Sequence, residues 1–166
     1  MPFSLVPVNP KDLNVKGMAE ELQTVADEVA DRMKDDYEAG VQTWQHKVDF
    51  TSEVDVNING AVSIEIDTDD LIYLFVHEGT KAHDIFPRRA RYLRFQSGYT
   101  AKTQPGAISS RSGGPSGSVQ YRSYVRHPGT EGRRFGTLIK AKWDPFFKRE
   151  MQRALDQGAK RSNHSI

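Results

Sequence analysis

Cysteine is absent from the sequence, which excludes disulfide bonds, thiol catalysis and the zinc or iron–sulfur sites that need thiolate ligands. Long apolar runs are absent as well: the longest extends from Leu71 to Val76, far below the ~20 residues that a membrane-spanning helix requires. The N-terminus lacks a basic segment followed by an apolar stretch, so we expect neither a secretion signal nor association with a membrane. With 166 residues, 37% of them hydrophobic and 27% charged, the chain is expected to form one folded domain over residues 1–166.

Signatures of catalysis are also scarce. The sequence has no glycine-rich phosphate loop and no nucleophile elbow, so we expect no enzymatic activity and no cofactor. His77, Glu78 and His83 place two imidazoles and a carboxylate close together, but a helical zinc motif needs its histidines four residues apart. We therefore favour structural or surface histidines over a metal site. One group of carboxylates lacks the glycine of a calcium loop and is interpreted as a solvated corner: Glu65, Asp67, Asp69 and Asp70.

Charge is divided unequally along the chain. Residues 1–86 hold 18 Asp and Glu against 6 Lys and Arg, and residues 87–166 hold 17 Lys and Arg against 4 acidic residues. The two parts thus carry −12 and +13, although the whole chain carries only +1. This division has three interpretations: the basic part contacts nucleic acid, the two parts attract each other within one fold, or the acidic face of one copy contacts the basic face of the next.

Apolar residues recur at steps of three or four through the first acidic segment, which predicts an amphipathic helix. They are Met18, Leu22, Val25, Val29, Met33 and Tyr37. Asp12 or Asn14 can cap the start of this helix, and Gly40 can end it in a left-handed conformation.

Downstream of this helix the apolar period changes to two, which predicts antiparallel, half-buried strands. Val48 and Phe50 begin the pattern, and residues 54–66 are expected to form a hairpin around Asn59-Gly60, a pair favoured in type I′ turns. Residues 71–77 are continuously apolar, which is consistent with either a strand covered on both faces or the start of a short helix.

Residues 97–118 contain five Gly, six Ser and two Pro, a composition that predicts a mobile loop. This glycine-rich segment is a candidate assembly arm that orders against a neighbouring subunit, and a plain surface loop is the alternative. Its glycines are Gly98, Gly106, Gly113, Gly114 and Gly117.

The last part of the chain predicts a strand over residues 118–126 and a helix from Phe135 that is broken at Asp144-Pro145. The break is expected because proline suits the first position of a helix but not its interior. Residues 159–166 are expected to be a disordered tail. The order of elements predicts an α+β fold: an antiparallel sheet with a long N-terminal helix and a broken C-terminal helix packed against it, plus the flexible Gly/Ser loop.

Residues 87–95 interleave arginines with aromatic and apolar residues. As a strand, this segment would present a basic contact surface to phosphate groups, which makes a small nucleic-acid-binding domain the alternative function. A basic strand edge that discourages aggregation is the simpler explanation. The arginines of this candidate surface are Arg88, Arg89, Arg91 and Arg94.

Two segments end in the same pattern, His-x-Gly-Thr, after an apolar or aromatic stretch. They are His77-Glu78-Gly79-Thr80 and His127-Pro128-Gly129-Thr130. Glycine permits a positive φ and threonine can cap the next element, so we interpret both segments as turns that reverse the chain.

Most of residues 15–157 carry a resemblance to a known family. The acidic helix is followed by residues 73–80, then Ile85-Phe86-Pro87 leading into Leu93-Arg94-Phe95, then residues 125–130 and Phe135 before a C-terminal helix. This order resembles the small tail-component family of long-tailed bacteriophages, the tail-completion and neck proteins related to minor tail protein Z. Family members commonly carry a proline-phenylalanine pair after the His-Pro-Gly turn, whereas this chain has Arg134-Phe135.

The resemblance implies a structural protein of the virion that joins head to tail or completes the tail, and that is present in the host cytoplasm during assembly. It implies a ring of copies, expected as a hexamer, that contacts neighbouring neck or tail proteins, while genome DNA passes nearby without specific binding. No catalysis and no cofactor are implied. The oppositely charged parts of the chain fit such a ring, because a head-to-tail interface joins two different surfaces of each copy.

Overall fold

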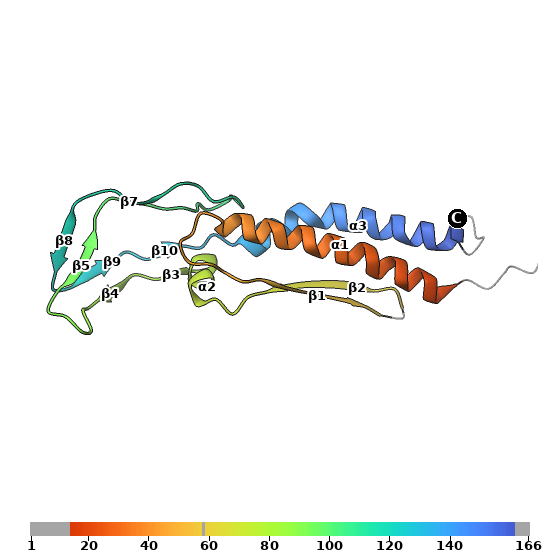
Figure 1. The fold of residues 1–166 in the computed structure, drawn as a ribbon, viewed down its shortest axis with the longest axis horizontal. Coiled ribbons are helices and arrows are strands. Elements are labelled where there is room, and N and C mark those ends of the chain that lie inside the picture. The colour runs from red at the N-terminus through yellow and green to blue at the C-terminus, as the bar shows by residue number, and fades with distance from the viewer. Residues whose placement is uncertain (1–13, 58, 162–166) are drawn as a thin grey trace, which may run out of the picture.

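The computed structural model describes residues 14–57 and 59–161. Within these ranges the protein is elongated (Figure 1) and combines three helices with short antiparallel strands, which confirms the predicted α+β class. The helices are α1 (Val15–Val41), α2 (Leu71–Glu78) and α3 (Phe135–Arg161). The strands are β1 (Thr51–Val56), β2 (Val62–Asp67), β3 (Gly79–Thr80), β4 (His83–Ile85), β5 (Leu93–Gln96), β6 (Tyr99–Thr100), β7 (Gly114–Pro115), β8 (Val119–Arg122), β9 (Val125–His127) and β10 (Thr130–Glu131). They form separate pairs rather than one sheet: β1–β2, β3–β10, β4–β9, β5–β8 and β6–β7.

The body of the molecule, which we define as α1, α2, α3 and the β1–β2 hairpin, holds the hydrophobic core. Helices α1 and α3 lie side by side, and the hairpin runs along α1 (Figure 1). The predicted stripe on α1 is confirmed at Leu22 and Val29, which are both buried. Val29 packs with Phe135 and Ile139 in one cluster, and Leu22 packs with Met151 in a second. The core therefore joins the first and last helices of the chain.

The sequence predicted the start of α1 correctly but not its end. Asn14 is the N-cap, and its side-chain oxygen accepts a hydrogen bond from the Gly17 amide at 3.0 Å, while Asp12 lies outside the described residues. The predicted left-handed stop at Gly40 is wrong, because α1 continues to Val41 and Gly40 is buried. A side chain there would lie 2.9 Å from the Ile108 carbonyl oxygen, so this glycine instead allows a later segment to pack against the helix.

The hairpin over residues 54–66 is confirmed, with Val54 opposite Ile64. Its turn is not the two-residue type I′ turn that Asn59-Gly60 suggested. The Asn57 amide donates to the Ala61 carbonyl at 3.0 Å, so three residues separate these two partners instead of two. The Asn57 side chain accepts from two amides of the loop, and Gly60 has a φ of 77°. Val48 and Phe50 are buried as their period predicted, although they precede β1 and lie outside any strand.

The C-terminal helix is not broken at Asp144-Pro145, since α3 is one helix with Pro145 inside it. Proline removes one backbone hydrogen bond and costs ~3 kcal/mol in a helix interior. Trp143 and Met151, on either side of it, are both buried in the core, and this packing offsets the local cost. The helix also includes residues 159–161, which corrects the disordered tail expected from 159; residues 162–166 lie outside the described part. No helix among the described residues is long and apolar enough to cross a membrane.

Ion pairs between the acidic and basic parts of the chain hold α1 against α3. Lys142 Nζ lies 2.6 Å from Asp36 Oδ2, and Trp143 Nε1 donates to the same oxygen at 2.7 Å. At the other end of the helix pair, Arg161 pairs with Glu21. One of the three interpretations of the charge division was that the two parts attract each other within one fold. The contacts between α1 and α3 fit this interpretation.

Candidate assembly surface

Residues 79–131, called the projection below, extend away from the body at the end where α2 lies (Figure 1). The chain runs outward through β3 and β4 and comes back through β5 and β6. It then runs outward again through β7 and β8 and returns through β9 and β10, so that each later strand pairs with an earlier one. Among the described strands of the projection, β3 and β10 make the main contacts with a helix, α2, which means that most of the projection has no second layer to cover its side chains.

The two His-x-Gly-Thr segments face each other at the base of the projection. Thr80 lies opposite Thr130, and Gly79 lies opposite Glu131. Gly79 and Gly129 have φ values of 83° and 94°, as expected for glycine at these positions. A Cβ at Gly129 would lie 2.3 Å from the Thr80 carbonyl oxygen, well inside van der Waals contact. The glycines therefore allow the two backbones to approach closely.

The chain reversal expected at His127-Pro128-Gly129-Thr130 is wrong. Strands β9 and β10 run on in one direction, because β4 and β3 pair with them in the same order. Pro128 and Gly129 interrupt this ladder without turning the chain back. Glycine is favoured both in turns and where two backbones approach closely, so the same residue pattern fits either structure.

Two histidines near the base of the projection stack on each other. His83 lies opposite His127, and their ring centroids are 5.1 Å apart. Nδ1 of His127 accepts from the Gly129 amide at 3.0 Å, while Nδ1 of His83 contacts the Lys81 carbonyl at 2.9 Å. In the described ranges no three His, Asp or Glu side chains are grouped in a way that could hold a metal ion. The arrangement gives these rings a structural role.

The glycine-rich segment 97–118 contains β6 and β7 and doubles back on itself. A Cβ at Gly117 would lie 2.4 Å from Ser97 Oγ, and one at Gly113 would lie 2.6 Å from the Thr100 carbonyl oxygen. Between these strands the segment reaches α1, where Ser110 Oγ donates to the Ala39 carbonyl at 3.0 Å. The mobility predicted for this segment stays a prediction. Gly113 and Gly117 allow two stretches of its backbone to lie close together.

The strands expected over residues 87–95 and 118–126 are each shorter than the sequence suggested. Arg88, Arg89 and Arg91 lie in bends, and only Arg94 lies in a strand, β5. No described strand pairs with residues 86–92, because β8 ends at Arg122 opposite the first residue of β5. Residues 118–126 are likewise interrupted between β8 and β9. A strand ends where the neighbouring strand that pairs with it ends, and the residue pattern does not reveal this position.

The projection is rich in positive charge. It contains nine Lys and Arg but only Asp84 and Glu131 as acidic residues. Asp84 pairs with Arg126, whose Nη1 lies 3.2 Å from Oδ2 of the carboxylate. The four arginines of the candidate basic surface, in contrast, form no ion pair with any residue in the described ranges. The outer end of the projection is therefore an exposed cationic surface.

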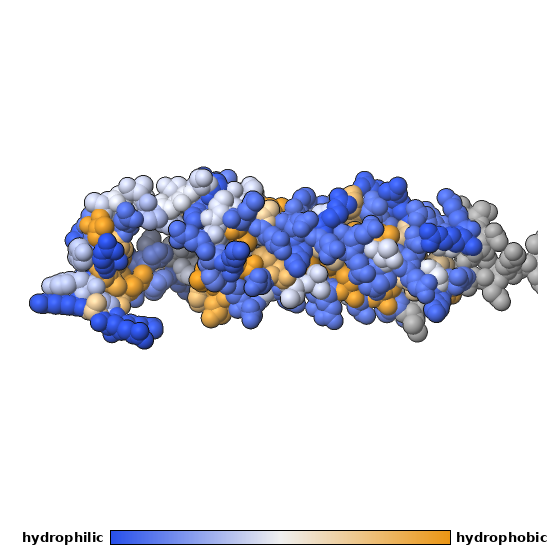
Figure 2. All heavy atoms as spheres, in the orientation of Figure 1, coloured by the Kyte–Doolittle hydropathy of each residue, from blue (hydrophilic) through white to orange (hydrophobic). Residues whose placement is uncertain are grey.

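Large apolar side chains are exposed over the projection as well. Figure 2 shows hydrophobic residues, in orange, at its outer end. Phe86 is 64% exposed and stacks on Tyr124, with their ring centroids 6.0 Å apart. The full set is Ile85, Phe86, Tyr92, Phe95, Tyr99, Val119, Tyr121 and Tyr124. Exposed apolar groups in this number, bordered by charged residues, are typical of a protein–protein interface.

Helix α2 settles the ambiguity of residues 71–77 in favour of a helix. Asp70 is its N-cap, and Oδ1 of Asp70 accepts from the Tyr73 amide at 2.7 Å. Tyr73 is the one buried residue of α2 and stacks on Phe135. The outward face of α2 carries Leu71, Leu74 and Phe75, which are 65%, 48% and 57% exposed. This face forms a second apolar surface, which Figure 2 shows at the edge of the body beside the projection.

Asp70 is also expected to make α2 sensitive to acid. Burial tends to raise the pKa of the Asp70 carboxyl, but hydrogen bonds from the His46 side chain and from the Tyr73 and Ile72 amides outweigh it and hold the pKa below its usual value. A lowered pKa stabilises the fold above the unfolded pKa, and this contribution is lost as the pH falls through the folded pKa. Asp70→Asn keeps a capping group but removes the charge, and we expect it to lower the free energy of unfolding by about 1 kcal/mol near neutral pH.

This difference between wild type and Asp70→Asn should shrink as the pH falls below the ordinary pKa of an aspartate, ~4, and through the lowered pKa of Asp70 in the folded protein, because the carboxyl then loses its charge. Urea unfolding at several pH values measures it. A difference that stays constant across this range would show that the Asp70 charge does not stabilise α2.

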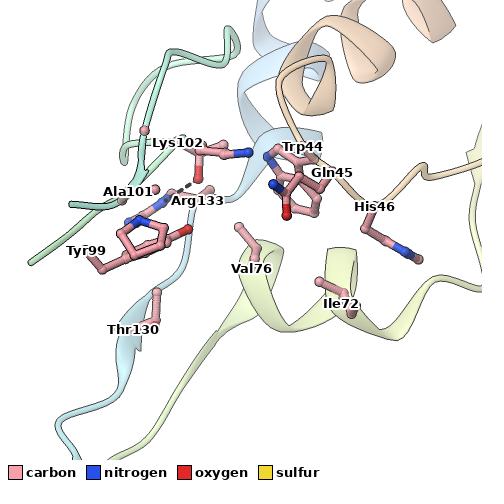
Figure 3. Close-up of a pocket in the computed structure, with 14 residues that line it drawn as sticks. Trp44, Gln45, His46, Ile72, Val76, Tyr99, Ala101, Lys102, Thr130 and Arg133 are labelled. Carbon is pink, nitrogen blue, oxygen red and sulfur yellow. Dashed lines mark hydrogen bonds between the residues drawn. The ribbon is translucent and has the colours of Figure 1, made fainter. Parts of the chain in front are cut away.

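A pocket of about 410 Å³ lies where the projection meets the body (Figure 3). Ile72 and Val76 line it from α2, and Trp44 lines it from the segment after α1. Its two cations already have hydrogen-bond partners: Arg133 Nε donates to Thr103 Oγ1 at 3.2 Å, and Lys102 Nζ donates to the Thr43 carbonyl at 2.7 Å. These bonds join the projection to the segments that follow α1 and precede α3, so we interpret the pocket as the seam between projection and body.

Comparisons of this chain with known protein families, with characterised proteins and with solved structures give no match. The candidate site therefore depends on the geometry described above, and the resemblance drawn from the sequence stays a prediction.

The sequence drew attention to the four arginines, whose role as a contact surface stays a prediction, and to the two repeated endings, but it did not place the endings opposite each other. It also missed the outward face of α2. Leu71, Leu74 and Phe75 follow a spacing of three and four, which is the signal that could have indicated one face of a helix. In so short and apolar a segment, the same residues fit a buried strand equally well.

Proposed function

We propose that this protein is a structural subunit that assembles with copies of itself into a ring, and that the ring joins head to tail or completes the tail of a long-tailed bacteriophage. The observation that carries the proposal is the projection: residues 79–131 extend from a well-packed body and leave eight large apolar side chains exposed. Burial of such groups against another molecule is favourable by ~25 cal/mol for each Å² of apolar surface removed from water.

The shape and charge of the chain support a head-to-tail arrangement. The projection is basic, while α1, β1 and β2 lie in the acidic part of the sequence. Two unlike surfaces on one chain can join successive copies, and such contacts form a closed ring when the rotation between copies divides the circle. The resemblance to tail-completion and neck proteins gives this ring its proposed place in the virion.

The test is genetic. In the phage that encodes this chain, disruption of its gene should yield filled heads and separate tails that do not join, and the wild-type chain supplied from a plasmid should restore infectious particles. Purified wild-type virions should contain the chain in a fixed ratio to other neck proteins by quantitative mass spectrometry. Complete, infectious particles that form without the chain would contradict the proposal.

Nucleic-acid binding is the second candidate, and the unpaired arginines of the projection favour it. Phosphate binding releases counterions, so this function requires retention of DNA that weakens steeply as salt concentration rises. Charge reversal at Arg88 and Arg89 should abolish such retention. If wild-type protein retains DNA in this way as a monomer, the second candidate replaces the first.

A further inference from the structure

We propose that the outer end of the projection of one copy docks on the outward face of α2 and the adjoining face of the β1–β2 hairpin of the next copy. This inference rests on the proposed ring and specifies which surfaces form it. It commits to a second copy of this chain as the occupant of the apolar α2 face.

The apolar groups of the two surfaces are comparable in kind and in exposure. On α2, the residues Leu71, Leu74 and Phe75 form a short ridge that the body does not cover. On the projection, the stacked pair of Phe86 and Tyr124 is 64% and 56% exposed. Aromatic side chains that dock on an aliphatic surface are typical of the centre of a protein–protein interface.

The charges around these apolar groups are opposite. Phe86 is followed by the bends that carry Arg88, Arg89 and Arg91, none of which has an ion-pair partner in the described ranges. Next to the α2 face, the outer side of the hairpin carries only acidic charge: Glu53, Asp55, Glu65 and Asp67. Figure 1 shows α2 and the hairpin along the same long edge of the molecule. An apolar centre with opposite charges at its rim matches the requirements of a specific contact.

The acidic face of the hairpin brings like charges together, which a cationic partner would neutralise. Glu53 lies directly opposite Glu65, and both are exposed. Like charges opposite each other on neighbouring strands destabilise a sheet. Neither carboxylate forms an ion pair with a residue that the structure describes. Docked arginines would relieve this repulsion, whereas an aliphatic or acidic partner would not.

The absence of native cysteine allows a direct test by cross-linking. One variant carries Phe86→Cys and a second carries Leu74→Cys, and the two are mixed and oxidised, so that a disulfide between them can only join separate chains. We expect a covalent dimer of the two variants. Lys160→Cys, at the exposed far end of α3, replaces Leu74→Cys in the control and should give little product.

Charge reversal gives a second readout that does not depend on an apolar substitution. We expect Glu53→Lys with Glu65→Lys, and separately Arg88→Glu with Arg89→Glu, each to weaken self-association by about tenfold or more. Mixing the two reversed variants should restore association between them, because the charges are again opposite. Sedimentation velocity measures all three cases, and circular dichroism confirms that each variant folds.

The outcomes separate this inference from the proposed ring. Self-association that persists in both reversed variants, without cross-linking between positions 86 and 74, would overturn the docking and leave the ring standing. A wild-type chain that stays monomeric and gives no cross-link would overturn both.

Discussion

Replacing Gly129 by alanine is expected to open the base of the projection, whereas the same replacement at Gly106 is not. Both glycines have a positive φ, 94° and 79°, so alanine costs ~1–2 kcal/mol at either position. Only at Gly129 does the added Cβ meet backbone, 2.3 Å from the Thr80 carbonyl oxygen, while Gly106 has nothing within 4 Å. Overpacking of this kind adds roughly 1–3 kcal/mol, which must be relieved by separation of the strands.

Amide hydrogen exchange, followed by mass spectrometry, measures this effect. Residues 79–85 and 125–131 should exchange ~10-fold to ~100-fold faster in Gly129→Ala than in Gly106→Ala, since each 1.4 kcal/mol corresponds to a factor of ten. Exchange in the α1–α3 pair should be the same in both variants. Equal exchange at the base of the projection in the two variants would show that the close approach of Gly129 to Thr80 has no energetic consequence.

Phe135→Ala is expected to have the largest effect on global stability, about 3–5 kcal/mol. Phe135 is 1% exposed, stacks on Tyr73 of α2 and belongs to the cluster that also contains Val29 of α1. Its removal leaves a cavity where all three helices meet. Urea unfolding monitored by the fluorescence of Trp143, which is buried in the same cluster, reports the loss.

Phe86→Ala is the matched control for this prediction. It removes the same side chain from a position that is 64% exposed, so the free energy of unfolding of the dilute monomer should change by less than ~0.5 kcal/mol. Comparable losses from Phe135→Ala and Phe86→Ala would show that the projection, and not only the body, contributes to the folding core.

The body could be predicted from the sequence to a large extent because its signals are local and periodic. The stripe of apolar residues on α1 and the alternation in β1 and β2 each reflect one buried face. Pro145 is the exception: its local preference predicted a break, but burial of Trp143 and Met151 on either side outweighs that preference. Tertiary packing over a long helix thus overrides a single residue.

The candidate site was harder to predict because it depends on pairings between distant residues. Thr80 and Thr130 lie 50 positions apart, and nothing in either segment alone shows that they face each other. Exposure of Leu71, Leu74 and Phe75 is likewise invisible in the sequence, since apolar residues usually predict burial. The charge division left contact between copies as one of three interpretations, and the surfaces that could form such a contact became visible only in the fold.

Self-assembly of the full chain is the central claim, and its native mass tests this claim most directly. Light scattering coupled to size exclusion should show a species whose mass is a multiple of 18.7 kDa, which forms as protein concentration rises and dissociates as added salt screens the contact between projection and body. A monomer of 18.7 kDa at every protein and salt concentration would contradict the account.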